Sequence, residues 1–175
     1  MSIAQAQITC VIADDHPAVL DSVSRVLAAH GIGILATARD GEDAVRAIQE
    51  HEPTVAVVDL RMPALSGIGV ARRIGQHTAL ILYTGYSDRT LLIEALDAGV
   101  RGFVLKEAPL ADVARAVETV AKGNVYVDPV LAGVLASREA TAAAEDADTA
   151  GARGPPAARR RSRQRGDRAR APHRG

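Results

Sequence analysis

The sequence predicts an α/β protein with a doubly wound parallel sheet. Short apolar runs alternate five times with segments whose apolar residues recur at helical spacing, within about 120 residues. Polar groups directly follow four of these runs, and right-handed crossovers place the carboxyl ends of parallel strands on one edge of the sheet. Beyond residue 138 the composition changes to Ala, acidic residues and then Arg, which predicts a disordered C-terminal tail.

The first two strands are expected at residues 8–13 and 32–38. The first ends in Asp14 and Asp15, and Pro17 then suits the first turn of a helix. Apolar residues at helical spacing carry that helix as far as His30-Gly31, which is a typical stop. These apolar positions are Val19, Val23, Val26 and Leu27.

The central strand is expected at residues 55–58 and ends abruptly in Asp59. A helix begins after Asp40-Gly41 and precedes this strand, with Ala44, Val45 and Ile48 on one face. After the central strand, Ser66 is placed to cap a short helix that carries Ile68, Val70 and Ile74.

The last two strands are expected at residues 79–83, followed by Thr84, and at 102–105, followed by Lys106. Ser87 or Asp88 can cap the helix between them. Pro109 opens a final helix that stops near Gly123.

The polar groups at the strand ends point to phosphoryl chemistry. Three carboxylates on one edge repel one another unless a cation joins them, and oxygen ligands suit Mg²⁺. Lys106 adds a positive charge and Thr84 a hydroxyl donor, so the set could hold a phosphoryl group on a carboxylate. We interpret these residues as one site, although each alone would be unremarked at the end of a strand.

Four segments resemble the receiver domain of bacterial two-component response regulators. They are ITCVIADDHPAVLDSV, VAVVDLRMPALSGI, ILYTGY and GFVLKEAP, and the resemblance covers roughly residues 7–124. It implies a flavodoxin-like sheet with strand order 2-1-3-4-5 and a switch that takes a phosphoryl group from a sensor histidine kinase. It also implies a cytoplasmic protein that is no metabolic enzyme, but catalyses its own phosphorylation and slow dephosphorylation.

The resemblance assigns roles to individual residues. Asp59 matches the phosphoacceptor, Asp15 the direct Mg²⁺ ligand and Asp14 an acid that acts largely through water. The main-chain carbonyl of Arg61 is expected to supply a further ligand. Thr84 matches the switch hydroxyl, Lys106 the phosphate-contacting lysine and Phe103, the only Phe in the chain, the switch aromatic.

The segments DDHP, KEAP and GNVYVDPVLAGVLASR are similar to the NarL/LuxR type of these regulators. The resemblance predicts a receiver (phosphoacceptor) domain at residues 1–124, a linker helix at 125–138 and a disordered tail at 139–175. In that type the linker leads to a helix-turn-helix domain that binds specific DNA. The resemblance also predicts that two copies of the chain can form a homodimer. Residues 139–175 cannot build such a domain, because they lack aliphatic residues larger than Ala beyond residue 150.

The tail has two further interpretations. It contains nine arginines and one aspartate at residues 151–175, so residues 1–150 keep 12 basic and 20 acidic side chains. A basic arm of this kind contacts nucleic-acid phosphates without sequence preference. Alternatively, the tail is an out-of-frame remnant: shifting the frame at residues 147–174 permits a reading that resembles the start of a LuxR-type helix-turn-helix domain, and the nucleotide sequence decides this.

Composition excludes several other classes of protein. No run approaches the about 18 apolar residues of a membrane span, and no signal peptide is recognisable. The single cysteine, Cys10, lies in an apolar run, which predicts a buried thiol. Two rivals remain from the site chemistry: a stand-alone receiver that acts by protein contact or as a phosphate sink, and a haloacid-dehalogenase-like phosphatase. The phosphatase is disfavoured because its two acids are spaced Asp-x-Asp, whereas Asp14 and Asp15 of this sequence are adjacent.

Overall fold

A computed structural model describes residues 7–137 of the 175-residue chain. The predicted tail at 139–175 lies outside the described residues. Within them the elements follow in the order β1 (Thr9–Ala13), α1 (Pro17–Ala29), β2 (Gly33–Ala38), α2 (Gly41–His51), β3 (Val55–Val58), α3 (Gly67–Ile74), β4 (Ala79–Thr84), α4 (Arg89–Asp97), β5 (Gly102–Leu105), α5 (Leu110–Ala121) and β6 (Tyr126–Val127). A further helix spans residues 129–137.

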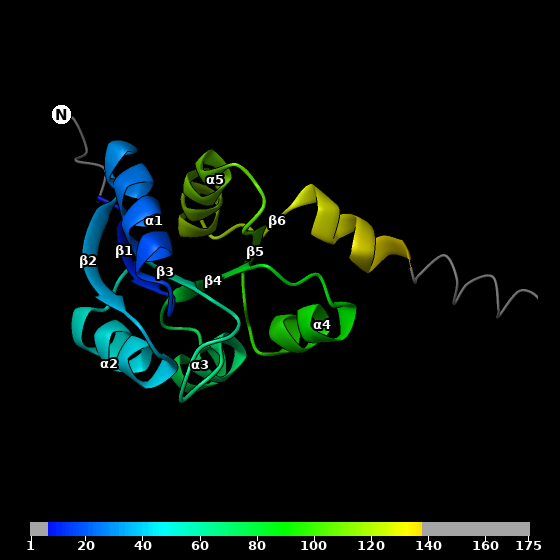
Figure 1. The fold of residues 1–175 in the computed structure, drawn as a ribbon, viewed down its shortest axis with the longest axis horizontal. Helices are drawn as coiled ribbons and strands as arrows, with labels where there is room; N and C mark the ends of the chain where they lie inside the picture. Colours follow the sequence, from blue (N-terminus) through cyan, green and yellow to red (C-terminus); the bar gives the residue numbers. More distant parts are fainter. Residues whose placement is uncertain (1–6, 138–175) are drawn as a thin grey trace, which may run out of the picture. The chain divides into compact units, whose positions relative to one another are not determined.

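The strands form one parallel sheet in the order β2-β1-β3-β4-β5-β6. Helices α1 and α5 cover one face, and α2, α3 and α4 cover the other (Figure 1). The predicted doubly wound sheet of order 2-1-3-4-5 is therefore confirmed, with β6 added at its edge. Strand β3 lies at the centre and is buried along its whole length.

Short-range signals in the sequence set the helix starts. Pro17 occupies the first turn of α1. The Ser66 hydroxyl accepts a hydrogen bond from the Gly69 N–H at 3.2 Å and caps α3, as predicted. Of the two candidates for α4, Asp88 is the cap, and its carboxylate accepts from the N–H groups of Thr90 and Leu91. Each cap pairs N–H groups that the first turn of a helix leaves without partners.

The segment after α5 differs from the prediction of a single helix at 125–138. The structure has strand β6 first, and the helix begins only at residue 129. A two-residue strand gives no periodic signal in the sequence, and it exists here because β5 offers it free main-chain groups. Tyr126 N–H donates to the Arg101 carbonyl at 3.0 Å, and Asp128 N–H donates to the Phe103 carbonyl at 2.9 Å.

Two apolar cores lie on the two faces of the sheet. Cys10 and Tyr83 belong to the core under α1 and α5, whereas Phe103 and Leu131 belong to the core on the side of α2, α3 and α4. The prediction of a buried thiol is confirmed, since Cys10 is fully buried and burial raises its pKa to about 12. Among residues 7–137, no helix has the length and continuous hydrophobicity needed to cross a membrane.

Position 41, where α2 begins, requires a glycine because the chain passes very close to the loop after β3 there. A Cβ at this position would lie 2.6 Å from the Leu65 Cβ and closer still to the Leu65 carbonyl oxygen. Gly133, in contrast, is exposed in the helix of residues 129–137, and a Cβ there would meet no atom within 4 Å. Alanine substitutions at these two glycines therefore compare a crowded position with an open one.

We expect Gly41→Ala to lower the free energy of unfolding by about 1–3 kcal/mol, because the added methyl forces the β3–α3 loop to move. Gly133→Ala should raise it by up to about 1 kcal/mol, because alanine favours helix over glycine. Urea denaturation followed by circular dichroism measures both. Equal effects of the two substitutions would show that the close approach at Gly41 is not a constraint on the fold.

Candidate functional site

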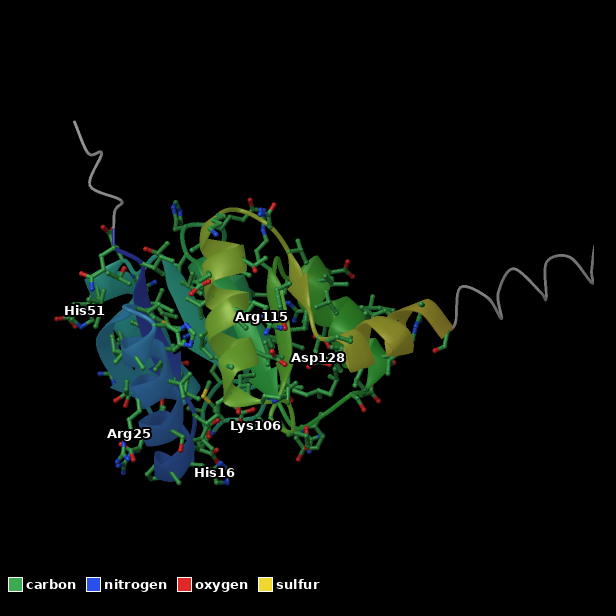
Figure 2. All side chains as sticks on the ribbon, turned by 90° about the horizontal axis from the view of Figure 1, so that it is seen from above. His16, Arg25, His51, Lys106, Arg115 and Asp128 are labelled. Carbon is green, nitrogen blue, oxygen red and sulfur yellow. The ribbon has the colours of Figure 1, made fainter. Side chains whose placement is uncertain are left out.

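The carboxyl ends of the strands deliver the predicted polar residues to one edge. Three of these residues continue the main-chain hydrogen bonding of the sheet beyond the ends of their strands. The N–H of Asp14 donates to the Ala38 carbonyl, and the N–H of Asp59 donates to the Ala13 carbonyl. The N–H of Lys106 donates to the Thr84 carbonyl, and all three distances are 2.8–3.1 Å. These main-chain hydrogen bonds therefore position the three residues independently of their side-chain contacts. Figure 2 shows His16 and Lys106 together at this end of the molecule.

Lys106 joins two of the carboxylates. Its ammonium lies 2.6 Å from Asp14 Oδ2 and 3.0 Å from Asp59 Oδ2. The side chain is 21% exposed, and its partners are 2% and 6% exposed, so water screens these contacts poorly. Burial alone lowers the pKa of Lys106, but the hydrogen bonds to Asp14 and Asp59 outweigh it and raise the pKa above its ordinary value. The lysine therefore stays charged at neutral pH.

Asp59 is held as a buried acid whose charge is only partly compensated. Burial raises its pKa, and the nearby Asp14 raises it further. The hydrogen bond and charge of Lys106 act in the opposite direction, as does a hydrogen bond from the Arg61 main chain, but the net direction is upward. A cation brought to this edge would relieve the remaining cost, because opposite charge favours the ionised carboxylate.

The donor set fits a divalent cation. Ligand atoms of Asp14, Asp15, His16 and Asp59 all lie within 4.8 Å of one another. Asp14 Oδ2 is completely buried and, apart from its ion pair with Lys106, has no hydrogen-bonding partner among the described residues. Asp15 is 35% exposed and does not pair with Lys106, so its carboxylate faces the open side of the cluster. Carboxylate oxygens in this arrangement are the ligands that Mg²⁺ prefers.

His16 lies at the rim of the cluster and is 68% exposed. Its ring Nδ1 nevertheless lies 2.7 Å from Asp15 Oδ1 and 3.2 Å from Asp14 Oδ1. The main-chain N–H of His16 donates to Asp14 Oδ1 at 2.9 Å. The imidazole of His16 thus contacts both acids. The adjacency of Asp14, Asp15 and His16 in the sequence was the signal for this contact.

Thr84 lies at the same edge, fully buried, and its hydroxyl accepts a hydrogen bond from the Tyr86 N–H at 3.1 Å. Tyr86 was not singled out in the sequence. Its ring lies under the Arg61 guanidinium, 3.9 Å from the ring centroid. This contact joins the loop after β3 to the loop after β4, beside Asp59. Because 24 residues lie between Arg61 and Tyr86 in the sequence, only the folded chain brings them together.

Phe103 does not join the polar cluster. It is fully buried in the apolar core on the α4 side, paired in register with Leu82 of β4 and Val127 of β6. The structure therefore places the predicted switch aromatic in close packing next to the edge strand.

The family model of the response regulator receiver domain matches residues 10–118. The chain belongs to this family. It is 34% identical over 134 residues to the "Probable transcriptional regulatory protein NarL" of Mycobacterium tuberculosis, covering 74% of this chain and 62% of that protein. It is 38% identical over 123 residues to the "Oxygen regulatory protein NreC" of Staphylococcus haemolyticus, covering 67% of this chain and 57% of that protein. The chain therefore spans less than two thirds of the length of these receiver relatives.

Solved receiver structures agree with the fold. The signal receiver domain of the putative response regulator NarL from Mycobacterium tuberculosis aligns with a TM-score of 0.66 at 31% identity, over 69% of this chain and all of that one. A LuxR-family response regulator from Aurantimonas sp. SI85-9A1 aligns with a TM-score of 0.74 at 27% identity, over 77% of this chain and 99% of that one. These matches do not favour the phosphatase alternative, and the receiver is a signalling domain.

The raised pKa of Asp59 predicts that its charge opposes folding in the absence of metal. A carboxyl whose pKa is raised in the folded state binds its proton more tightly there, so its ionisation costs stability above its folded pKa. Below the ordinary carboxyl pKa the group is protonated in both states and the cost vanishes. In EDTA, Asp59→Asn should therefore unfold at a higher temperature than the wild type at pH 7, and at the same temperature near about pH 3.

Differential scanning fluorimetry over this pH range tests the prediction. Asp21→Asn is a suitable control, because Asp21 is 61% exposed on α1 and pairs with Arg25 of its own helix. A lower unfolding temperature for Asp59→Asn at pH 7 would mean that the pair with Lys106 outweighs the burial of the charge.

Proposed function

We propose that this chain accepts a phosphoryl group on Asp59 from the phosphohistidine of a sensor kinase, in the cytoplasm, and changes conformation as a result. An oxygen of the Asp59 carboxylate would attack phosphorus, the phosphorus–nitrogen bond would break and the imidazole would leave with the bonding electrons. The observation that carries the proposal is Asp59 itself: a buried carboxylate at the end of the central strand, 3.0 Å from a lysine ammonium.

The other residues have supporting roles in this proposal. Lys106 binds phosphoryl oxygens, since the phosphoryl group would replace the Asp59 carboxylate as its anionic partner. Thr84 turns its hydroxyl from the Tyr86 N–H toward the same oxygens. Phe103 follows Thr84 and carries the change into the core. The metal would be held by Asp14, Asp15, Asp59 and the main-chain carbonyl of Arg61.

Mg²⁺, when bound, would offset charge on Asp59 and on the incoming phosphate. The residues that form its site would also let the chain catalyse its own phosphorylation from small phosphodonors, and the slow hydrolysis that resets it. The acyl phosphate is attacked by water, and the buried position of Asp59 keeps that step slow.

The output of the switch belongs to this proposal too. One relative is named a transcriptional regulatory protein, and we propose transcriptional control as the output here. Specific DNA binding requires an intact helix-turn-helix domain, and a second copy of the chain is a candidate partner.

Phosphorylation is tested with acetyl phosphate, Mg²⁺ and intact-protein mass spectrometry. The wild type should gain one phosphoryl mass and Asp59→Asn none, because the amide cannot form an acyl phosphate. Asp21→Asn, which alters an exposed carboxylate outside the cluster, should be labelled like the wild type. Labelling of Asp59→Asn at the wild-type rate would rule out Asp59 as the acceptor.

Metal binding should depend on Asp15 more than on Asp14. Asp15 faces the open side without a lysine partner, whereas Asp14 is already paired with Lys106. We expect Asp14→Ala to weaken Mg²⁺ binding by about tenfold, as loss of an outer-shell partner does, and Asp15→Ala to weaken it further. Isothermal titration calorimetry measures both, and equal affinities of the two variants would contradict direct ligation by Asp15 with a water-mediated role for Asp14.

A further inference from the structure

His16 places a nitrogen donor beside the carboxylates of the proposed metal site. Its Nδ1 atom lies 2.7 Å from Asp15 Oδ1 and 3.2 Å from Asp14 Oδ1. One ring nitrogen of His16 and one carboxylate oxygen from each of Asp14, Asp15 and Asp59 all lie within 4.8 Å of one another. Figure 2 labels His16 at the end of the molecule that also carries Lys106. The proposed phosphoryl transfer gives this imidazole no role.

The separations between these donor atoms match the ligand shell of a six-coordinate dication. Ligands at about 2.0–2.1 Å in octahedral geometry place neighbouring donors about 3 Å apart and opposite donors about 4 Å apart. The two distances from Nδ1 to the acids, 2.7 and 3.2 Å, lie on either side of the value for neighbouring donors. An ion held by Asp15 therefore has Nδ1 within reach after a small adjustment of the side chains.

The main chain holds the imidazole in this place without help from a metal. His16 precedes Pro17, and a proline restricts the residue before it to extended backbone conformations. His16 adopts such a conformation, with φ −97° and ψ 110°, and its main-chain N–H donates to Asp14 Oδ1 at 2.9 Å. Although His16 occupies the N-cap position of α1, its side chain makes no capping hydrogen bond. The ring is thus positioned for contact with the acids rather than for capping the helix.

Lys106 and His16 use different oxygens of Asp14. The Lys106 ammonium contacts Oδ2 of Asp14, whereas the His16 ring contacts Oδ1. The His16 side chain is 68% exposed and that of Asp15 is 35% exposed, so this side of the cluster is open to solvent. An ion can therefore enter between Asp15 and His16 without competing with Lys106 for Asp14 Oδ2.

A nitrogen ligand changes which metal ions a carboxylate site prefers. Carboxylate and water oxygens suit Mg²⁺ and Mn²⁺, whereas imidazole suits later transition metals such as Ni²⁺. Affinity for a site of given nitrogen and oxygen ligands rises from Mn²⁺ through Co²⁺ to Ni²⁺. The lone pair of Nδ1 is available in the neutral tautomer that carries its proton on Nε2.

We propose that Nδ1 of His16 is a direct metal ligand at this edge, and that it makes the site favour Co²⁺ and Ni²⁺ over Mg²⁺ more strongly than the carboxylates do by themselves. The inference rests on the proposed metal site of Asp14, Asp15 and Asp59 and adds a ligand to it.

Isothermal titration calorimetry of the full chain with Mg²⁺, Mn²⁺, Co²⁺ and Ni²⁺ tests the inference, at one fixed, slightly alkaline pH at which imidazole is neutral. His16→Ala should weaken Ni²⁺ binding by about tenfold or more, since loss of a direct ligand costs at least as much as loss of an outer-shell partner. Mg²⁺ binding should change by less than about twofold, because Mg²⁺ readily keeps a water in that position. The loss should grow in the order Mg²⁺, Mn²⁺, Co²⁺, Ni²⁺.

His16→Asn is the matched variant, because it offers an amide oxygen in place of the ring nitrogen. It should bind Mg²⁺ like the wild type and still lose affinity for Ni²⁺. The visible absorption bands of bound Co²⁺ should lie at shorter wavelength in the wild type than in His16→Asn, because imidazole nitrogen is a stronger-field ligand than an amide oxygen. This spectrum reports ligation directly and does not depend on phosphorylation.

Two controls locate the effect. His30→Ala removes a histidine at the opposite end of α1, where it lies 3.6 Å from Glu118, and it should leave the affinities for all four ions unchanged. Asp15→Ala should weaken binding of all four ions, which places them at this edge. Both His16 variants keep the other histidines of the chain, so a difference from the wild type reports on His16.

The sign of the His16→Ala effect separates ligation from a simpler role. An imidazole that only occupies the place of a cation would be displaced by the metal, and its removal would then strengthen binding of all four ions. That result would overturn the inference, and so would an equal change in affinity for Mg²⁺ and Ni²⁺. In either case the metal site of the three carboxylates stands. If the wild type binds none of the four ions at this edge, the proposed metal site fails and this inference fails with it.

Discussion

The contact of one ammonium with two buried carboxylates governs the functional edge of this protein. Lys106 holds Asp14 and Asp59 at 2.6 and 3.0 Å, and without it the edge would concentrate negative charge in a poorly solvated place. Its compensation is incomplete, because the pKa of Asp59 remains raised and Asp15 has no lysine partner. That deficit of positive charge favours the binding of a cation at this edge.

The main-chain hydrogen bonds of the sheet position the residues of this edge independently of their side-chain contacts. Main-chain hydrogen bonds run past the ends of β1, β3 and β5 onto Asp14, Asp59 and Lys106 themselves. A displaced ladder would separate the ammonium from its partners, so the parallel register and the chemistry depend on each other. The loops above the edge are joined less firmly, by the stacking of Arg61 on Tyr86 and by the Thr84 hydroxyl, and they are the parts that a new charge on Asp59 can move.

The opposite end of this chain of contacts is the edge strand. Phe103 lies between β4 and β6 in register, under α4 and the helix of residues 129–137. The residues after α5 are thus part of the receiver's packing.

The sequence by itself determined the five main strands, their parallel arrangement and the residues gathered at their ends, because alternating apolar runs and strand-terminal Asp, Thr and Lys are local signals. The strand order came from the resemblance to the receiver family. It also determined the cap at Ser66, since only neighbours on the chain are involved. Between Ser87 and Asp88 it left the choice open, and the structure assigns the cap of α4 to Asp88. Tertiary structure decided the rest. Strand β6 exists only because β5 presents free main-chain groups to Tyr126 and Asp128. The stacking of Arg61 on Tyr86 and the burial of Phe103 in the same core as Leu131 depend on distances between segments far apart in sequence, which no local pattern of residues encodes.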